Sequence, residues 1–375
     1  MVTQSVEAND GTVVRPEAAA DGDVSTSDIV TGEVGTGEVG TGDVGTGDVD
    51  TTVDMLIVGA GPAGLYGAYY AGFRGMSVAL MDSLPEAGGQ VTAMYPEKVI
   101  YDVAGFPAIR GRELVDALVT QAAQFDPTYL LDQQAAELAH EPDAVVVTSS
   151  QGHRVRARVV VITGGLGTFT PRPLPTGTGH LGRGLVYFVP KLDVYADQDV
   201  IVVGGGDSAF DWALALEPIA RSVTLVHRRD RFRAHAATIE RVEASRVEIL
   251  TFSEVAAIHG EDRIEKVELV QTRTGDRHVR PAQAVVAALG FTADLGPLTR
   301  WGLTMARRHI AVDSTMFTGV DRVFAAGDIT EYPGKVRLIA TGFGEVATAV
   351  NNAAPVVDPA AKVFPGHSSG DSTAS

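Results

Sequence analysis

The hydrophobic positions of the chain form two similar series, each built from a buried strand, a glycine-rich turn, a helix and a second strand. The first series covers residues 53–82, VDMLIVGAGPAGLYGAYYAGFRGMSVALMD. The second covers residues 199–229, DVIVVGGGDSAFDWALALEPIARSVTLVHRR. Short apolar runs bounded by glycine are typical of buried parallel strands. The pattern therefore predicts an α/β fold with two Rossmann-like dinucleotide-binding domains.

Each series leads into a charged, strand-rich stretch that returns to an apolar strand. Residues 144–165 alternate apolar and polar positions around the pair QG, and residues 263–291 do so around the triplet TGD, which predicts a hairpin in each stretch. The runs VVVITGG and VVAALGF predict buried parallel strands. The segment 166–184 is rich in Gly, Pro and Thr. Together with a second segment near Gly290–Gly296, it predicts two crossings between domains.

The first 52 residues differ from the rest of the chain. They hold 11 acidic residues and one basic residue, and residues 31–50 repeat a five-residue unit four times. A segment rich in glycine and acidic residues, with few large apolar side chains, buries too little apolar surface to offset the entropy lost on ordering. Residues 1–52 are therefore predicted to form a disordered acidic tail. Two roles stay open for it. It is either an inert solubilising leader or a self-masking tail that competes electrostatically with an acidic partner.

Composition and charge restrict the class of protein. With 375 residues, 45% of them hydrophobic and 21% charged, the chain has the make-up of a soluble globular protein of two domains. The net charge of −17, of which the tail carries −10, argues against nucleic-acid binding. The start lacks a basic region followed by an apolar run, and no apolar run is long enough to span a bilayer. We therefore expect no membrane partner and a cytoplasmic location.

The chain contains no cysteine. This excludes disulfide frameworks, cysteine-ligated zinc, iron–sulfur clusters and dithiol catalysis. No metal site is predicted.

The turn GAGPAG in the first series has the glycine spacing of a dinucleotide site. Gly59 makes the tight turn, Gly61 lets the backbone approach a pyrophosphate, and Gly64 allows close packing of helix on strand. The N-terminus of the helix then faces the phosphates. Asp82 ends the next strand, where its carboxylate can accept hydrogen bonds from ribose hydroxyls. These features predict the adenosine half of FAD or NAD at this site.

The turn GGGDSA in the second series predicts a different nucleotide. Arg228 and Arg229 stand at the offset that Asp82 has in the first series. An acid there would repel a ribose 2′-phosphate, whereas arginines bind it through charge-assisted hydrogen bonds. The sequence therefore favours NADPH over NADH. The predicted NADPH-binding residues are Gly204, Gly206, Asp207, Ser208, Ala209, His227, Arg228, Arg229 and Arg233.

A later segment favours FAD at the first site. Residues 321–330, DRVFAAGDIT, form an apolar strand that ends in Gly327–Asp328, and Asp328 is placed to accept hydrogen bonds from ribitol hydroxyls. Residues 340–353 predict a helix whose N-terminus can stabilise negative charge on a reduced flavin.

Four segments carry a family resemblance: GGQVTAMYPEKVIYDVAGFP (88–107), GGGDSAFDWA (204–213), HRRDRFRAH (227–235) and the pair Gly327–Asp328. Together they resemble the thioredoxin-reductase-like ferredoxin–NADP(+) reductases, over residues 53–370. The resemblance implies a homodimer and an FAD domain that is split in sequence. The implied boundaries are 53–171 for its first part, 172–290 for an inserted NADPH-binding domain, and 291–375 for its second part with a C-terminal extension.

The same resemblance implies further flavin contacts. Gln90 and Tyr95 would lie against the isoalloxazine, with Tyr95 stacked on one face, and Phe169 would touch the ring. A His-Ser-Ser segment from the partner subunit, at positions 367–369, would cover the other face. The predicted FAD-binding residues are Gly59, Gly61, Gly64, Asp82, Gln90, Tyr95, Phe169, Asp328, His367 and Ser369. The chain departs from the family at Ala236, where an acid is common, so no role is assigned to that position.

The resemblance implies a ferredoxin–NADP(+) reductase. NADPH would give a hydride to FAD, which would pass single electrons reversibly to ferredoxin or flavodoxin, while the inserted domain rotates. No side chain is expected to act as a general acid or base. Thioredoxin reductases need a CxxC dithiol, and residues 184–199 hold no cysteine in its place. Two alternatives stay open, an NADPH-dependent flavodoxin or quinone reductase and a non-catalytic redox-sensing module.

Ferredoxins are typically acidic, so an acidic enzyme needs a local basic surface to bind one. The candidates for this docking surface are Arg172, Lys191, Lys335 and Arg337.

Overall fold

The structure, a computed structural model, describes residues 49–366. The predicted acidic tail lies outside the described residues except for its last four positions, and so do His367 and Ser369. The described residues belong to one compact unit, residues 48–375.

The first sheet has seven strands, and its middle is parallel. The order is β5 (Thr128–Leu130), β2 (Val78–Met81), β1 (Thr51–Val58), β8 (Arg154–Ile162), β7 (Val145–Ser149) and β6 (Ala135–His140), and β21 (Val323–Ala325) pairs with the carboxyl end of β8. The predicted hairpin around QG is the antiparallel pair β7–β8. A strand from the far end of the chain thus completes a sheet begun by the first series.

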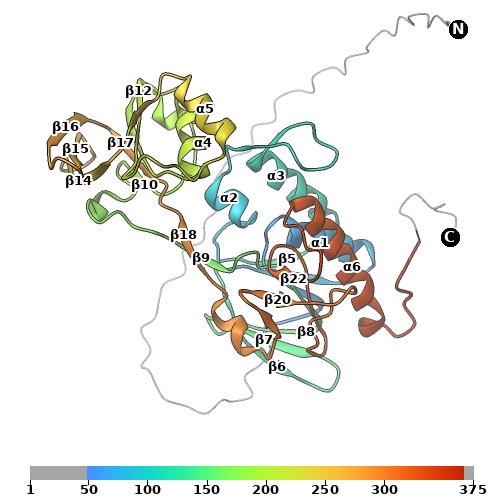
Figure 1. Cartoon of the computed structure of the whole chain (residues 1–375). Helices are drawn as coiled ribbons and strands as arrows, with labels where there is room; N and C mark the ends of the chain where they lie inside the picture. Colours follow the sequence, from blue (N-terminus) through green and yellow to red (C-terminus); the bar gives the residue numbers. More distant parts are fainter. Residues whose placement is uncertain (1–48, 367–375) are drawn as a thin grey trace, which may run out of the picture. The chain divides into compact units, whose positions relative to one another are not determined.

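This sheet is apolar along its length because both of its faces are covered. Met55 and Ile57 of β1 pack under the helices α1 (Pro62–Phe73), α3 (Gly111–Ala122) and α6 (Ile339–Val357). Leu56 and Val58 point to the opposite face, against Trp301 and the segment that includes the 3-10 turn η4 (Gly296–Arg300). Alternate residues of one strand therefore serve two separate cores. Figure 1 shows α1 and α6 lying side by side over the sheet.

The second sheet is parallel throughout. Its order is β10 (Leu185–Val186), β17 (Ala284–Ala287), β11 (Asp199–Val203), β12 (Ser222–Val226) and β13 (Glu248–Leu250). One face packs on α4 (Asp207–Leu216) and α5 (Ala236–Glu243). The other packs on an antiparallel sheet of β14 (Ser253–His259), β15 (Lys266–Gln271) and β16 (Arg277–Pro281). The predicted hairpin around TGD is β15–β16, and the predicted strand VVAALGF overlaps β17 at residues 285–287 and ends on the first residue of β18.

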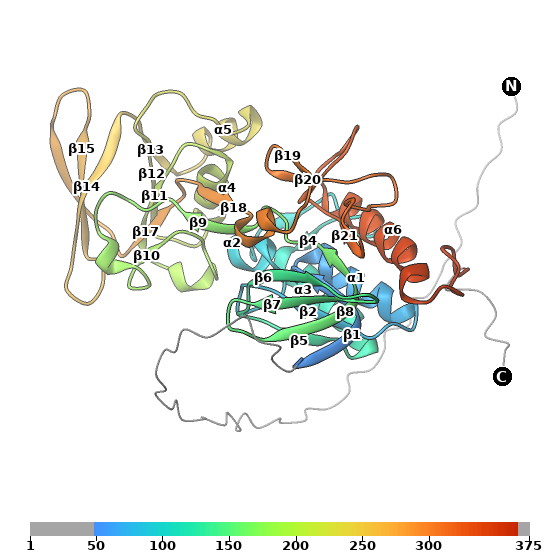
Figure 2. The same ribbon diagram turned by 90° about the horizontal axis from the view of Figure 1, so that it is seen from below.

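The two predicted crossing segments lie side by side as a two-stranded ribbon (Figures 1 and 2). β9 (Thr168–Pro171) pairs antiparallel with β18 (Phe291–Asp294), and the N–H of Arg172 donates to the carbonyl of Gly290 at 2.9 Å. The chain enters the second sheet beyond β9 and returns through β18. The domain boundaries at residues 171 and 290 remain predictions.

Shorter elements surround the first sheet. They are α2 (Gln90–Met94), β3 (Val99–Ile100), β4 (Ile109–Arg110), η1 (Ala123–Phe125), β19 (Met305–Ala306), β20 (His309–Ala311) and β22 (Thr330–Glu331). The 3-10 turns η2 (Thr178–His180) and η3 (Asp193–Tyr195) precede β11. The predicted helix at 340–353 is α6, which runs slightly further at both ends. Within residues 49–366, no helix combines the length and the apolar character needed to cross a membrane.

Candidate functional site: two nucleotide cradles

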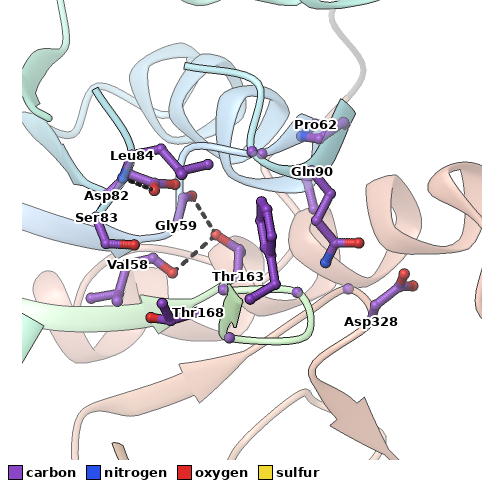
Figure 3. Close-up of a pocket in the computed structure, with 18 of the residues that line it drawn as sticks. Val58, Gly59, Pro62, Asp82, Ser83, Leu84, Gln90, Thr163, Thr168 and Asp328 are labelled. Carbon is purple, nitrogen blue, oxygen red and sulfur yellow. Dashed lines mark hydrogen bonds between the residues drawn. The ribbon is translucent and has the colours of Figure 1, made fainter. Parts of the chain in front are cut away.

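A cavity of about 250 Å³ opens at the carboxyl edge of the first sheet, where β1 turns into α1. Ligands of open α/β sheets bind at this edge, beside the point where the strand order reverses. Figure 3 shows the lining side chains converging from β1, the segment after β2, α2, the segment after β8, and the segment after β21.

The three glycines of the first turn have different tasks. A Cβ on Gly59, whose φ is +113°, would lie 2.7 Å from the carbonyl group of Thr163, and one on Gly64 would lie 1.9 Å from the carbonyl oxygen of Gly59. These two glycines are required by the fold itself. The nearest atom to a Cβ on Gly61 is 3.9 Å away, so Gly61 leaves open space on the cavity side. Within residues 49–366, the N-terminus of α1 has no side-chain capping hydrogen bond, which suits a bound pyrophosphate.

Asp82 is fixed by the backbone around it. Its side chain accepts a hydrogen bond from the N–H of Ala60 at 2.6 Å and another from the N–H of Leu84 at 2.9 Å, one on each carboxylate oxygen. Asp82 is 9% exposed, and burial raises the pKa of its carboxyl despite those bonds. Asp82 lines the cavity and each of its oxygens can accept a further hydrogen bond, which suits the ribose hydroxyls of a nucleotide.

The other described residues predicted for FAD reach the same cavity from separate elements. Gln90 begins α2, Tyr95 follows it, Phe169 belongs to β9 and Asp328 follows β21. Burial, with smaller contributions from Asp328 and Asp102, raises the pKa of Tyr95 to about 12, so the phenol stays neutral. The structure thus brings these side chains together with Gly59, Gly61 and Asp82. Their contacts with FAD remain predictions.

Some lining residues were missed by sequence reasoning. The hydroxyl of Thr163 donates to the carbonyl of Gly59 at 2.7 Å and so holds the glycine turn (Figure 3). Its position directly after an apolar strand was an available signal. The Oε1 atom of Gln133 is buried without a hydrogen-bond partner among the described residues and lines the cavity with Asp82. Nothing in the sequence around Gln133 marks it.

The residues of the second turn divide, like those of the first, into positions that pack tightly and one that leaves open space. A Cβ on Gly204 would lie 2.4 Å from the carbonyl oxygen of Ala288, and Ala209 packs fully buried against Gly204. A Cβ on Gly206 would meet no atom within 4 Å. The N-terminus of α4 likewise has no side-chain capping hydrogen bond in the part of the chain that the structure describes. Gly204 and Ala209 therefore serve packing, whereas Gly206 leaves room for a ligand.

The segment after β12 presents free positive charge. Arg228, Arg229 and Arg233 are exposed, and among residues 49–366 no acidic side chain forms an ion pair with them. The ring of His227 packs under Gly205, and burial together with the nearby arginines lowers its pKa. His227 is therefore neutral at pH 7, and the arginines alone supply charge for a phosphate.

Two backbone contacts hold this arginine segment against the glycine turn. The N–H of Arg233 donates to the carbonyl of Gly205 at 2.7 Å, and the N–H of His235 donates to the carboxylate of Asp207 at 2.9 Å. Asp207, predicted as a nucleotide-binding residue, thus already anchors the segment that carries the arginines.

A second cavity, of about 390 Å³, lies between α4 and the segment that includes the end of the small helix α2. It is lined by Tyr95, Phe188, Trp212 and Phe291, and by Ser208 of α4. Tyr95 borders both cavities. The ion pair Lys98–Asp211, at 2.7 Å, lies at its edge. Because both partners are partly exposed, this pair contributes little to stability.

One predicted docking residue is wrong. The side chain of Lys335 is 1% exposed and pairs with Glu345, so its charge cannot belong to a docking surface. Lys191 pairs with Asp193 at 3.0 Å and Arg337 pairs with Glu331 at 2.6 Å. Arg172 is exposed.

Asp328 gives a prediction about pH. Burial raises the pKa of its carboxyl above the ordinary 3.8, while Lys335 and Arg337 act in the opposite direction. A carboxyl with a raised folded-state pKa contributes stability below pH 3.8, and this contribution is lost as the pH rises through the folded-state pKa. We expect FAD-free Asp328→Asn protein to be more stable than the original at pH 7 and equally stable below pH 4. Thermal unfolding from pH 3.5 to 8 measures this. Parallel stability curves would contradict the prediction.

Comparison with known proteins agrees with the presence of two nucleotide-binding sites. A family model described as pyridine nucleotide-disulphide oxidoreductase matches residues 53–353. The ferredoxin–NADP reductase of Frankia casuarinae is 87% identical over 85% of this chain and 99% of its own length. That of Nocardioides sp. is 65% identical over 84% and 97%, and that of Thermus thermophilus 46% identical over 84% and 96%.

Solved structures support the fold. The thioredoxin reductase of T. acidophilum superposes with a TM-score of 0.66 at 24% identity, over 81% of this chain and 98% of that one. The thioredoxin reductase of Lactococcus lactis gives 0.65 at 24% identity, over 81% and 99%.

The predicted thioredoxin-reductase-like fold, the oxidoreductase class and the cofactors FAD and NADPH are thereby confirmed. The chain belongs to the pyridine nucleotide-disulphide oxidoreductase family and, within it, to the thioredoxin-reductase-like ferredoxin–NADP reductases.

Proposed function

We propose that this chain binds FAD in the first cavity and NADPH at the second glycine turn, and that it passes electrons from NADPH to ferredoxin. The observation that carries the proposal is the contrast between the two cradles. In the first, the strand after the glycine turn is followed by the buried carboxylate of Asp82. In the second, the corresponding strand is followed by Arg228 and Arg229, which are exposed and have no ion-pair partner among the described residues. When bound, FAD supplies the chemistry that joins a two-electron donor to a one-electron acceptor.

The residues of the first cavity bind and orient the cofactor in this proposal. Gly61 and the N-terminus of α1 receive the pyrophosphate, Asp82 the ribose, and Asp328 the ribitol chain. Tyr95, which lines the cavity, would pack on the isoalloxazine and exclude water from it. The N-terminus of α6, whose first residue Ile339 lines the cavity, favours negative charge at the ring. No described side chain has to act as a general acid or base.

The second cradle selects and directs NADPH. Arg228, Arg229 and Arg233 hold the 2′-phosphate, Gly206 and Ser208 lie under the pyrophosphate, and the second cavity leads from Ser208 to Tyr95. Hydride transfer needs the nicotinamide at the flavin, and ferredoxin needs access to the same ring. We therefore propose that the inserted domain turns on the ribbon β9–β18, which would break the weak Lys98–Asp211 ion pair and the hydrogen bond from Arg112 to the carbonyl of Pro190.

The electrons must leave for a separate molecule, because the chain has no cysteine to accept them. The relatives are named ferredoxin–NADP reductases, and we propose ferredoxin as the acceptor here, with flavodoxin as its substitute. We also propose a cytoplasmic homodimer in which His367 and Ser369 of one chain cover the flavin of the other. Arg172, Lys191 and Arg337 are the exposed candidates that remain for ferredoxin docking, and of these Arg172 has no ion pair among the described residues.

Cytochrome c reduction by NADPH tests the acceptor. Purified protein should reduce cytochrome c rapidly only when ferredoxin is added, and the rate should fall with added salt because docking is charge-guided. Reduction of dyes or quinones without any stimulation by ferredoxin would favour the quinone reductase alternative. Slow flavin reduction with every acceptor would favour a redox sensor.

A further inference from the structure

A buried ion pair, Lys335–Glu345, joins α6 to the segment that precedes it. The ammonium of Lys335 is 2.5 Å from a carboxylate oxygen of Glu345, and their side chains are 1% and 5% exposed. The hydroxyl of Tyr332 donates to the same oxygen at 2.6 Å. Removing two charges from water is costly, and an apolar pair of similar volume is often as stable or more so. Packing alone therefore does not account for this pair.

The pair holds the backbone of Gly327. The N–H of Gly327 donates to the second oxygen of Glu345 at 2.7 Å, and among the described residues it has no backbone acceptor. The carbonyl of Gly327 accepts from Lys335 at 2.9 Å and from Thr330. Gly327 has a φ of +82°, outside the strand that precedes it. The N–H of Gly327 is thus held by Glu345 and its carbonyl by Lys335, both of which follow it in the chain.

The fixed backbone leads directly into the first cavity. Gly327 and Asp328 line it, and so does Gly342, one turn before Glu345 on α6. A Cβ on Gly342 would lie 3.5 Å from the Cα of Gly327, so the helix and the turn touch. Lys335 and Glu345 act in opposite directions on the pKa of Asp328. The pair thus adds little net charge at this wall of the cavity.

We propose that Lys335 and Glu345 are positioning residues for FAD, which lock the Gly327–Asp328 turn to the N-terminal part of α6. This rests on the proposed location of the flavin. Glu345 supplies the acceptor that fixes the Gly327 N–H, and Lys335 neutralises Glu345 and holds the neighbouring carbonyl. An apolar replacement would fill the same volume and leave the turn free to move.

The double variant Lys335→Met/Glu345→Leu separates positioning from packing. We expect FAD-free protein that folds with a lowered melting temperature, because the gain from removing two buried charges is offset by leaving the N–H of Gly327 and the hydroxyl of Tyr332 without their acceptor. We expect the dissociation constant for FAD to rise about tenfold or more, since hydrogen bonds to charged groups are lost at the turn. The visible spectrum of the bound flavin should also shift. Fluorescence titration of the FAD-free protein and absorbance spectra measure both.

The matched control is Arg280→Met/Glu248→Leu, which removes an exposed ion pair joining β13 and β16. It should leave FAD affinity and the spectrum unchanged. Original affinity and spectrum in the Lys335→Met/Glu345→Leu protein would overturn the proposal.

If that double variant fails to fold, Glu345→Gln replaces it, because the amide keeps the shape but loses one acceptor. Its FAD affinity should still fall, and unchanged affinity would overturn the proposal. Failure of the flavin location itself would show separately, as unchanged FAD affinity in Gly61→Ala.

Discussion

Replacing Arg228 and Arg229 together by alanine is expected to lower kcat/KM for NADPH about 100-fold and to leave the value for NADH nearly unchanged. Each arginine donates charge-assisted hydrogen bonds to the 2′-phosphate, and two such bonds at about 1.5 kcal/mol each amount to roughly two factors of ten. NADH has no 2′-phosphate and loses nothing. Steady-state kinetics with both coenzymes and a dye acceptor, which bypasses ferredoxin docking, measures the ratio.

The control is Arg246→Ala in the same sheet region. Arg246 is exposed and pairs with Glu217, away from the arginine segment, so the coenzyme ratio should not change. An equal loss with NADPH and NADH in the double variant would mean that the segment had lost its fold. An unchanged ratio would show that the arginines do not select the coenzyme.

Gly61→Ala is expected to give a folded but nearly colourless protein, with FAD affinity lowered about 10- to 100-fold. Gly61 has a φ of −71°, which alanine adopts freely, and the new Cβ would meet no protein atom closer than 3.9 Å. The FAD-free protein should therefore unfold at the original temperature. The Cβ projects into the space assigned to the pyrophosphate, and forcing a group into filled space costs about 1–3 kcal/mol. FAD titration and thermal unfolding of FAD-free protein are the two measurements.

Substitutions at two further glycines serve as controls for that result. Gly344→Ala on α6 meets no atom within 4 Å and lies outside the cavity lining, so FAD affinity should be unchanged. Gly64→Ala places a Cβ 1.9 Å from the carbonyl oxygen of Gly59, so this protein should fail to fold. If Gly61→Ala bound FAD as tightly as the original, the pyrophosphate would lie elsewhere.

The local parts of the fold and site were predictable from the sequence. The glycine turns and the offset of Asp82 are recognised from patterns within about 30 residues, which the Rossmann rules describe directly. The contacts that Gly59 makes with Thr163, and the pairing of the strand before Gly327 with β8, join distant parts of the chain. The structure places Gly61 and Gly206 beside open space and the other turn glycines in tight packing. This division matches the separate tasks that the spacing assigned to them.

The remaining features depend on contacts between distant parts of the chain. The ribbon β9–β18 joins strands more than 110 residues apart, and neither strand has a pattern that reveals its partner. Lys335 follows a Pro-Gly pair and so resembles a surface residue in sequence. It is buried because Glu345, ten residues later, turns inward on α6. Sequence reasoning therefore assigned it to a docking surface, while the structure places it behind the flavin cavity.

Anaerobic mixing of the yellow protein with reduced coenzyme tests the central account most directly. NADPH should bleach the flavin absorbance rapidly and NADH much more slowly. Oxidised ferredoxin added afterwards should restore the yellow colour, with two ferredoxins reduced for each flavin. Faster bleaching by NADH, or a reduced flavin that ferredoxin does not reoxidise, would contradict the assignment of the two cradles and of the acceptor.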